Sequence, residues 1–290
     1  MDMTPFYKQW LTAPPRIEKG LDIKLYHESS THISSSWLKA ANKSMYNFFM
    51  YPNKPKKEVK AFKDGGMVHK YLLEREDFEK EYVLIKQSDF PFPEQTMAKK
   101  ENKAFIESQD RIVVTEEEWN FVVNVCARAS QDKFFTKVLN GDNVEDSFFW
   151  NCDETGLPLK TRPDLWKKGK SGVIVIDPKT TQDISEFTKS VCNLDYPLQA
   201  AIQCDGIRAC TGMDVSAYLY LAIEKEYPYD YCLYRLSEDD IEVGRRKYIH
   251  LLYKIKEAIE SGNIPSYGQQ YGDFTSGVVD LTLPSWYYSK

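Results

Sequence analysis

The chain has 290 residues, of which 42% are apolar and 14% aromatic, so it can bury a large core and is not a disordered chain. Its net charge of −5 gives it no overall attraction for nucleic acid, although lysines gather locally. It has no run of about 18 apolar residues and no signal-peptide pattern, so we expect no membrane span and a cytoplasmic location. Its cysteines show no paired spacing, so we expect no disulfide framework, zinc ribbon or iron–sulfur cluster.

The first half of the chain is predicted to be mainly helical. Residues 1–30 have no clear periodicity and are expected to form an irregular N-terminal arm. Apolar residues at three- and four-residue spacing, beside serine, threonine or aspartate caps, predict three helices: residues 33–50, a segment that begins at Asp64-Gly65-Gly66, and residues 116–140 with Thr115 as cap. Residues 85–112 are polar, and we expect a long loop there with one short helix.

The second half alternates strands with helices. Apolar, β-branched and aromatic runs predict strands at residues 144–150, 157–163, 173–177, 215–223 and 229–234. Helical periodicity is present at residues 185–191, 196–210 and 237–261, with Gly212 and Gly262 ending the last two. This order predicts an α/β fold with a mixed central sheet flanked by helices, in one domain over residues 31–264 followed by a tail, residues 265–290.

Two acids and a lysine frame a predicted hairpin. Asp164 precedes a turn-forming segment, and Asp177-Pro178-Lys179 ends the strand that follows it. Side chains alternate along a strand, so Asp177 and Lys179 project to the same side, and Asp164 meets them if residues 167–172 turn the chain back. Such a cluster suits metal-assisted phosphodiester hydrolysis. The spacing alone fits equally well a hairpin whose ends carry ordinary surface charges.

Other polar residues are candidates for the same site. Lys167, Lys168 and Lys170 lie between the two acids in the sequence, and we expect them to hold substrate phosphates there. Tyr196, Gln199 and Gln203 form one stripe of a helix, which either overlooks the acids or faces solvent. His69 lies beside Val68 and Leu73 on the second helix, where a lone histidine is ordinarily a core or boundary residue.

Four segments in order carry a family resemblance over residues 33–207: ISSSWLKAANKSMYNF, GGMVHKYLLE, TGLPLKTRPDLW…VIVIDPKTT and YPLQAAIQCDGI. Together they resemble the RecE-type, exonuclease VIII-like branch of the PD-(D/E)XK nucleases, which is common in phages and prophages. The resemblance implies a restriction-endonuclease-like core. It also implies Asp164 and Asp177 as metal carboxylates, Lys179 as the catalytic lysine, and His69 and the Pro178 carbonyl as further metal ligands.

The resemblance also implies a cofactor and partners. Tyr196 and Gln199 match the family's helix motif beside the cleavage point, and Glu145 is a weaker candidate for another acidic contact. Carboxylate and carbonyl oxygens suit Mg²⁺, and an imidazole makes Mn²⁺ a good substitute. Family members degrade linear double-stranded DNA from the 5′ end and leave 3′ single strands for an annealing protein. This implies that DNA ends, a homo-oligomeric ring (trimer or tetramer) and such a protein are partners in a bacterial cytoplasm.

Pro178 departs from the family pattern, which usually has an aliphatic residue between the aspartate and the lysine. Proline cannot donate a hydrogen bond in a strand ladder, so we expect the strand to end or bulge at this residue. Two alternatives stay open beside the exonuclease: an endonuclease on the same core, and a catalytically silent module that binds DNA ends during recombination.

Overall fold

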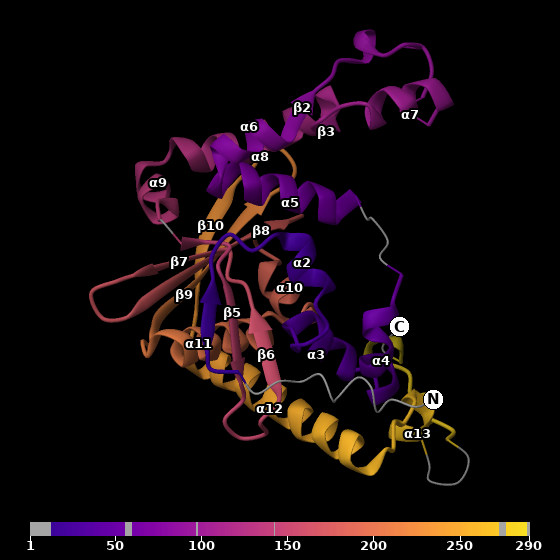
Figure 1. Ribbon diagram of the computed structural model, residues 1–290, viewed down its shortest axis with the longest axis vertical. Coiled ribbons are helices and arrows are strands. Elements are labelled where there is room, and N and C mark those ends of the chain that lie inside the picture. The colour runs from indigo at the N-terminus through magenta and orange to yellow at the C-terminus, as the bar shows by residue number, and fades with distance from the viewer. Residues whose placement is uncertain (1–12, 56–59, 97, 142, 273–276, 289–290) are drawn as a thin grey trace.

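A mixed five-stranded sheet lies at the centre of the molecule (Figure 1). The computed structural model describes residues 13–55, 60–96, 98–141, 143–272 and 277–288. The strand order is β10-β9-β8-β7-β4, in which β8 and β9 are parallel and the other neighbours antiparallel. These strands are β4 (Asn143–Val144), β7 (Leu165–Lys168), β8 (Val173–Thr181), β9 (Val215–Glu224) and β10 (Tyr231–Leu236). The predicted α/β class with a mixed sheet flanked by helices is confirmed.

The two faces of the sheet bury different side chains of β9. Leu221 and Ile223 pack in a cluster with residues of α5 (Lys60–Leu73) and α8 (Glu116–Gln131). Tyr218, Tyr220 and Ala222 pack on the other face with residues of α11 (Tyr196–Thr211). Because successive side chains of a strand point to opposite faces, one apolar strand serves both helical layers.

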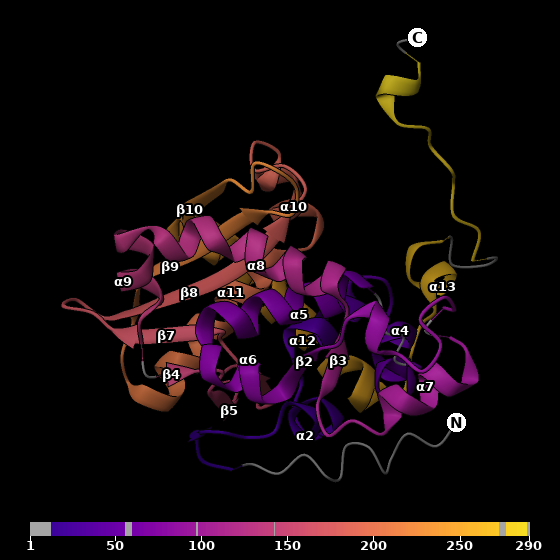
Figure 2. The same ribbon diagram turned by 90° about the horizontal axis from the view of Figure 1, so that it is seen from above.

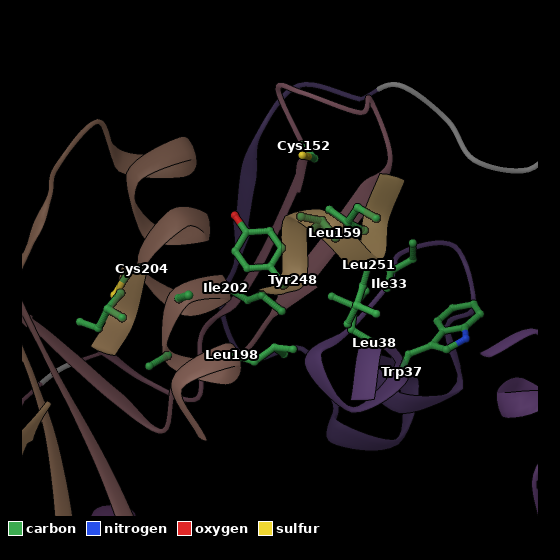
Figure 3. Packing of buried hydrophobic residues seen from close by; sticks show 14 of the residues in the cluster. Ile33, Trp37, Leu38, Cys152, Leu159, Leu198, Ile202, Cys204, Tyr248 and Leu251 are labelled. Atoms are coloured by element: carbon green, nitrogen blue, oxygen red, sulfur yellow. The ribbon is translucent and has the colours of Figure 1, made fainter. Parts of the chain in front are cut away.

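A smaller antiparallel sheet packs against α11. It consists of β5 (Ser147–Asn151) between β1 (Arg16–Glu18) and β6 (Pro158–Thr161). Figure 3 shows how Leu38 of α3 (Ser35–Ala41), Leu198 of α11 and Leu251 of α12 (Glu238–Ser261) gather with Leu159 of β6 in the main core. This core therefore fixes α3 and α11 relative to the strands.

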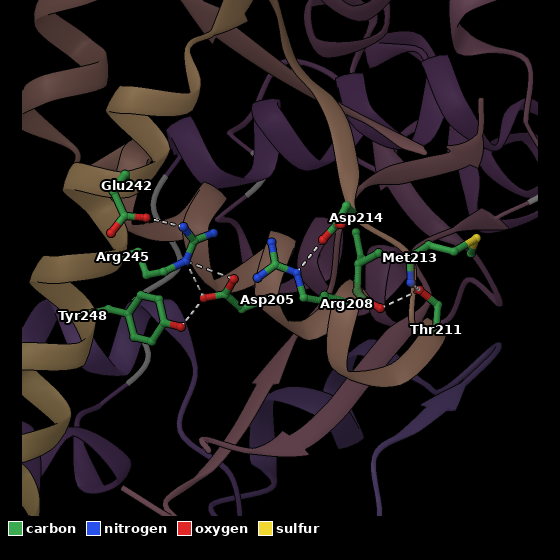
Figure 4. Close-up of polar contacts among 9 residues, drawn as sticks. Asp205, Arg208, Thr211, Met213, Asp214, Glu242, Arg245 and Tyr248 are labelled. Carbon is green, nitrogen blue, oxygen red and sulfur yellow. Dashed lines mark hydrogen bonds and ion pairs between the residues drawn. The ribbon is translucent and has the colours of Figure 1, made fainter. Parts of the chain in front are cut away.

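Polar contacts hold α12 against α11 (Figure 4). Arg245 of α12 donates to both carboxylate oxygens of Asp205 on α11, at 3.1 and 2.9 Å, and the Tyr248 hydroxyl donates to the same carboxylate. At Gly244 the helices are so close that an added Cβ would lie 2.1 Å from the carbonyl oxygen of Pro197. The first turn of α11 is therefore positioned by α12.

The remaining elements are short. They are α2 (Ile23–Glu28), α4 (Met45–Met50), η1 (Tyr51–Asn53), α6 (Arg75–Glu81), β2 (Tyr82–Leu84), η2 (Gln87–Asp89), α7 (Lys100–Glu107), β3 (Ile112–Val114), α9 (Lys133–Leu139), α10 (Phe187–Asn193), α13 (Tyr267–Tyr271) and η3 (Ser285–Tyr287). Strands β2 and β3 are parallel, and in Figure 1 the segment between them, with α7, extends away from the sheet. In Figure 2 residues 277–288 run away from the body beyond α13. None of the helices described has the length and apolar character that crossing a membrane requires.

Several predicted elements are divided in the structure because a local cap or bend intervenes. Residues 33–50 form α3 and α4, because the hydroxyl of Ser44 accepts the backbone N–H of Asn47 and starts a new helix. Asp132 caps α9 in the same way and divides the helix predicted over 116–140. The strand predicted over 144–150 is split between two sheets at Glu145, whose φ is 55°.

The predictions for three segments of the first half were also incomplete. Residues 1–30 were expected to be irregular, but β1 and α2 lie within them, while residues 1–12 lie outside the described part of the chain. Helix α5 begins at Lys60 rather than at Asp64-Gly65-Gly66, and both glycines lie inside it. Residues 85–112 contain the expected short helix, α7, but the β2–β3 pair that flanks it was not predicted.

Candidate active site

The β7–β8 hairpin brings the two motif acids together. Leu165 lies opposite Ile176 at the end of the ladder, so Asp164 and Asp177 are the next pair across the hairpin. The turn closes with a hydrogen bond of 2.7 Å from the N–H of Gly169 to the carbonyl of Gly172. Gly172 has φ 148°, and an added Cβ would lie 2.6 Å from the Asp214 carbonyl oxygen. The spacing of the motif thus follows from the register that this turn sets.

The hairpin lysines lie far from these acids. The turn is five residues from Asp164 along β7, which is about 16 Å for an extended strand. The Lys167 amine donates to the carbonyl of Val138, at 2.6 Å, at the C-terminal end of α9. The prediction that these lysines hold phosphates at the site is therefore wrong for Lys167, whose amine is bound to α9, and Lys168 and Lys170 follow it toward the turn, further from the acids.

Four side chains converge at the other end of the hairpin. Asp177 is fully buried, and its carboxylate pairs with the ammonium of Lys179. The same ammonium lies 3.8 Å from Oδ2 of Asp164, which in turn lies 3.3 Å from Nδ1 of His69 on α5. Lys179 and Asp164 are each 16% exposed and His69 is 23% exposed. The lysine amine therefore lies next to both carboxylates in a largely buried cluster.

Strand β8 continues through Pro178, so the expected end or bulge at this residue is wrong. Pro178 pairs with Leu221 in the parallel ladder, and the irregularity lies instead between Val173 and Ile174. The backbone groups of Pro178 point away from β9, toward the side where β7 has ended, so no ladder hydrogen bond is lost. The His69 ring hydrogen-bonds to the backbone of Pro178, which offers only its carbonyl. That carbonyl thus faces the cluster.

Burial and mutual charge set the protonation of the cluster. Burial and the charge of Asp177 raise the pKa of Asp164 well above its ordinary value. Burial alone would raise the pKa of Asp177 too, but the Lys179 ammonium outweighs it and lowers that pKa. Burial would likewise lower the pKa of Lys179, but the two carboxylates raise it. Burial, with Lys179, lowers the pKa of His69 to about 4, so the imidazole is neutral at pH 7.

The donor set fits a hard divalent cation. Oδ2 of Asp164 is buried without a hydrogen-bond partner, the neutral imidazole of His69 lies 3.3 Å from it, and the Pro178 carbonyl contacts the same imidazole. As the side chains stand, no group of three or more His, Cys, Asp or Glu residues in the described ranges is arranged to hold an ion, and the Lys179 ammonium neutralises Asp177 instead. The Lys179 ammonium therefore competes with a cation for the Asp177 carboxylate.

Helix α11 and strand β9 complete the surroundings of Asp177. The Gln199 amide lies 3.5 Å from Oδ2 of Asp177, and the ring centroid of Tyr196 lies 5.4 Å from the Lys179 amine. The structure thus places Tyr196 and Gln199 beside the acids, which is one of the two positions that the sequence left open for this stripe. Glu145 is different, because its carboxylate pairs with Arg162 at 2.6 Å.

Tyr218 was not among the predicted site residues, because it lies in a strand that was predicted from its apolar character. The Tyr218 hydroxyl, on β9, lies 3.2 Å from Oδ2 of Asp177 and 2.7 Å from the side-chain oxygen of Gln203. A phenol has one hydrogen, so it donates to Asp177 only if the Gln203 amide turns its NH₂ toward the phenol oxygen. The only signal in the sequence was a pair of tyrosines, Tyr218 and Tyr220, at alternate positions of a buried strand.

Comparisons with known proteins show the family and the fold of the chain. A family model described as "PDDEXK-like domain of unknown function (DUF3799)" matches residues 34–271. A crystal structure from Eubacterium rectale, described as "Putative exonuclease", superposes with a TM-score of 0.60 at 14% identity, covering 92% of this chain and 94% of that one. No curated protein matches the chain. At this identity the structural likeness shows the fold alone, and with the family match it confirms the restriction-endonuclease-like core.

Proposed function

Because this chain belongs to the family of PDDEXK-like domains (DUF3799), within the PD-(D/E)XK nuclease superfamily, we propose that it is a metal-dependent deoxyribonuclease with its active site at Asp164, Asp177 and Lys179. The observation that carries the proposal is the convergence of one fully buried carboxylate, one largely buried carboxylate and one ammonium at the end of the β7–β8 hairpin opposite its turn. Such a cluster costs folding free energy unless a cation and a phosphate use it.

The substrate is linear double-stranded DNA, digested from its 5′ end to leave 3′ single strands. The support is the ordered set of four segments that resemble RecE-type exonucleases, and the fold shared with a crystal structure described as an exonuclease. By the same resemblance the protein forms a homo-oligomeric ring and supplies single strands to an annealing protein. Its nuclease domain spans residues 31–264.

Mg²⁺ is the proposed cofactor, with Mn²⁺ as a substitute. Asp164, Asp177 and the Pro178 carbonyl would supply oxygen ligands, and His69 would supply a neutral imidazole nitrogen. When bound, the cation lowers the pKa of a water and neutralises charge that develops on the phosphate.

Side chains of the protein position the water, the phosphate and the metal ligands. Lys179 positions the attacking water and stabilises the negative phosphate oxygens once its ammonium is released from Asp177. Gln199 orients the water or the scissile phosphate, and Tyr196 contacts the DNA strand beside it. Tyr218, on β9, holds the Asp177 carboxylate in place, because its hydroxyl lies 3.2 Å from Oδ2 of Asp177.

The test is digestion of end-labelled linear duplex DNA with Mg²⁺, followed over time beside a closed circular control. Asp177→Ala and Lys179→Ala should abolish release of nucleotides while the proteins stay folded. Lys170→Ala, an exposed lysine at the far end of the hairpin, should digest DNA at the parent rate. Parent-rate digestion by both site variants would show that this site is wrong.

The circular control separates the alternatives. An endonuclease on the same core would cut closed circles, whereas an exonuclease that needs ends leaves them whole. A catalytically silent module would bind ends without releasing nucleotides. The reason for suspecting a silent module was Pro178, and β8 passes through this residue with its carbonyl facing the cluster.

A further inference from the structure

A second lysine, Lys39, lies beside the candidate active site. It is a half-buried residue of α3, and its amine donates to the carbonyl of Leu194, at 2.6 Å, just before α11 begins. The amine is 5.6 Å from the centroid of the Tyr196 ring, and the Lys179 amine is 5.4 Å from the same centroid. Two ammonium groups from different elements therefore meet at one aromatic ring.

Lys39 lacks the acidic partner that its neighbours have. Lys179 pairs with Asp177, and Lys247 pairs with Asp195 at 2.7 Å. Lys39 makes no ion pair within the described ranges, and its hydrogen-bond partner there is one carbonyl. An ammonium has three donors, so two remain for a ligand. The charge of Asp195 acts on Lys39, but the Asp195 carboxylate already pairs with Lys247 and accepts a hydrogen bond from the Asn42 amide at 2.9 Å.

The position of Lys39 makes this lack of an acidic partner unfavourable in the free protein. Burial lowers the pKa of Lys39 to about 8, and the charge of Lys179 adds to this effect although Asp195 opposes it. In a chain with more acidic than basic residues, 43 against 38, a cation held beside the site without a carboxylate is suited to an anion from outside.

We propose that Lys39 binds a backbone phosphate of the DNA strand, next to the phosphate that is cleaved at Lys179. The inference rests on the proposed nuclease function. A DNA strand carries a phosphate at every nucleotide, so a strand that places one phosphate at the acids brings its neighbours along the surface beside Tyr196. Lys39 thus holds the substrate in register and takes no part in the chemical step.

The test compares Lys39→Met with Lys43→Met. Lys43 is an exposed lysine four residues further along, so both variants lose the same charge from the same region. Binding of a short fluorescein-labelled duplex is measured at several salt concentrations with Ca²⁺ in place of Mg²⁺. For Lys39→Met we expect weaker binding and a slope of log K against log salt that is smaller by about 0.9, as for one lost phosphate contact. Lys43→Met should keep the slope of the parent protein.

Steady-state digestion adds a second readout. Lys39→Met should raise KM with little change in kcat, and Lys39→Arg should restore both binding and the salt slope. Thermal unfolding of each variant shows that it is folded. If Lys39→Met and Lys43→Met have the same salt slope while the parent digests DNA, Lys39 is not a phosphate contact and the nuclease function stands. A parent protein that neither binds nor digests DNA would overturn both proposals.

Discussion

Replacing Asp164 with asparagine should make the metal-free protein more stable although it removes a residue of the active site. The Asp164 carboxylate is buried, its Oδ2 has no hydrogen-bond partner, and it lies against the charge of Asp177. Asparagine has nearly the same shape without the charge. Its amide can also donate to the Asp177 carboxylate, which the aspartate can do only when it is protonated.

The magnitude follows from the unpaired oxygen. A buried acceptor without a partner costs about 1–3 kcal/mol, so we expect the free energy of unfolding of Asp164→Asn to exceed that of the parent by about this amount at pH 7. The direction in which the parent's stability changes with pH is set by the pKa of Asp164, which is raised in the folded state above its ordinary 3.8. The folded protein then binds this proton more tightly than the unfolded chain, so the parent loses stability as the pH rises from 3.8 through the raised pKa. The advantage of the variant should therefore vanish near pH 3.

Urea unfolding followed by tryptophan fluorescence, with EDTA and over a pH series, measures this difference. Addition of Mg²⁺ should shrink the gain, because the parent binds the cation better than the variant does. Asp177→Asn is the matched control, and it should be destabilised because it leaves the Lys179 ammonium without its closest carboxylate. If Asp164→Asn is less stable than the parent in EDTA, the two carboxylates are not the unfavourable pair described above.

Three further outcomes are expected. Gly244→Ala should destabilise the protein by about 1–3 kcal/mol, because the new Cβ meets the backbone of α11. Gly65→Ala, with open space around it in α5, should stabilise the protein by up to about 1 kcal/mol. If both substitutions change the free energy of unfolding in urea equally, α11 and α12 are not packed this closely. Tyr218→Phe should weaken Mn²⁺ binding about 10- to 100-fold in calorimetric titration, whereas Tyr234→Phe, which loses a hydroxyl that donates to the Ile184 carbonyl and not to an acid, should bind as the parent does. Burial lowers the pKa of His32 from 6.5 to about 4, so the unfolded chain takes up this proton first and the parent loses stability as the pH falls from 6.5 to 4. The free energy of unfolding of His32→Gln should fall less over that range. If the parent and His32→Gln show the same dependence of this free energy on pH, the lowered pKa of His32 is wrong.

Features that depend on neighbours in the sequence could be predicted from the sequence. Thr115 and Ser237 cap their helices as predicted, and Gly212 and Gly262 end theirs with φ of 71° and 69°. The hairpin between Asp164 and Asp177 was predictable for the same reason, because alternation along a strand and a glycine-containing turn are local properties. From these followed the sheet class and the three residues at the centre of the candidate site.

Features that depend on distant contacts were decided only by the tertiary structure. Pro178 fits a buried strand because β7 ends beside it, and Lys167 is turned away from the acids because α9 ends beside the hairpin. Tyr218 reaches Asp177 because β8 and β9 are parallel neighbours, 41 residues apart in sequence at this contact. Lys39 reaches Tyr196 through the packing of α3 on α11. Local propensity does not specify which strands and helices become neighbours, whereas burial of their shared apolar faces does.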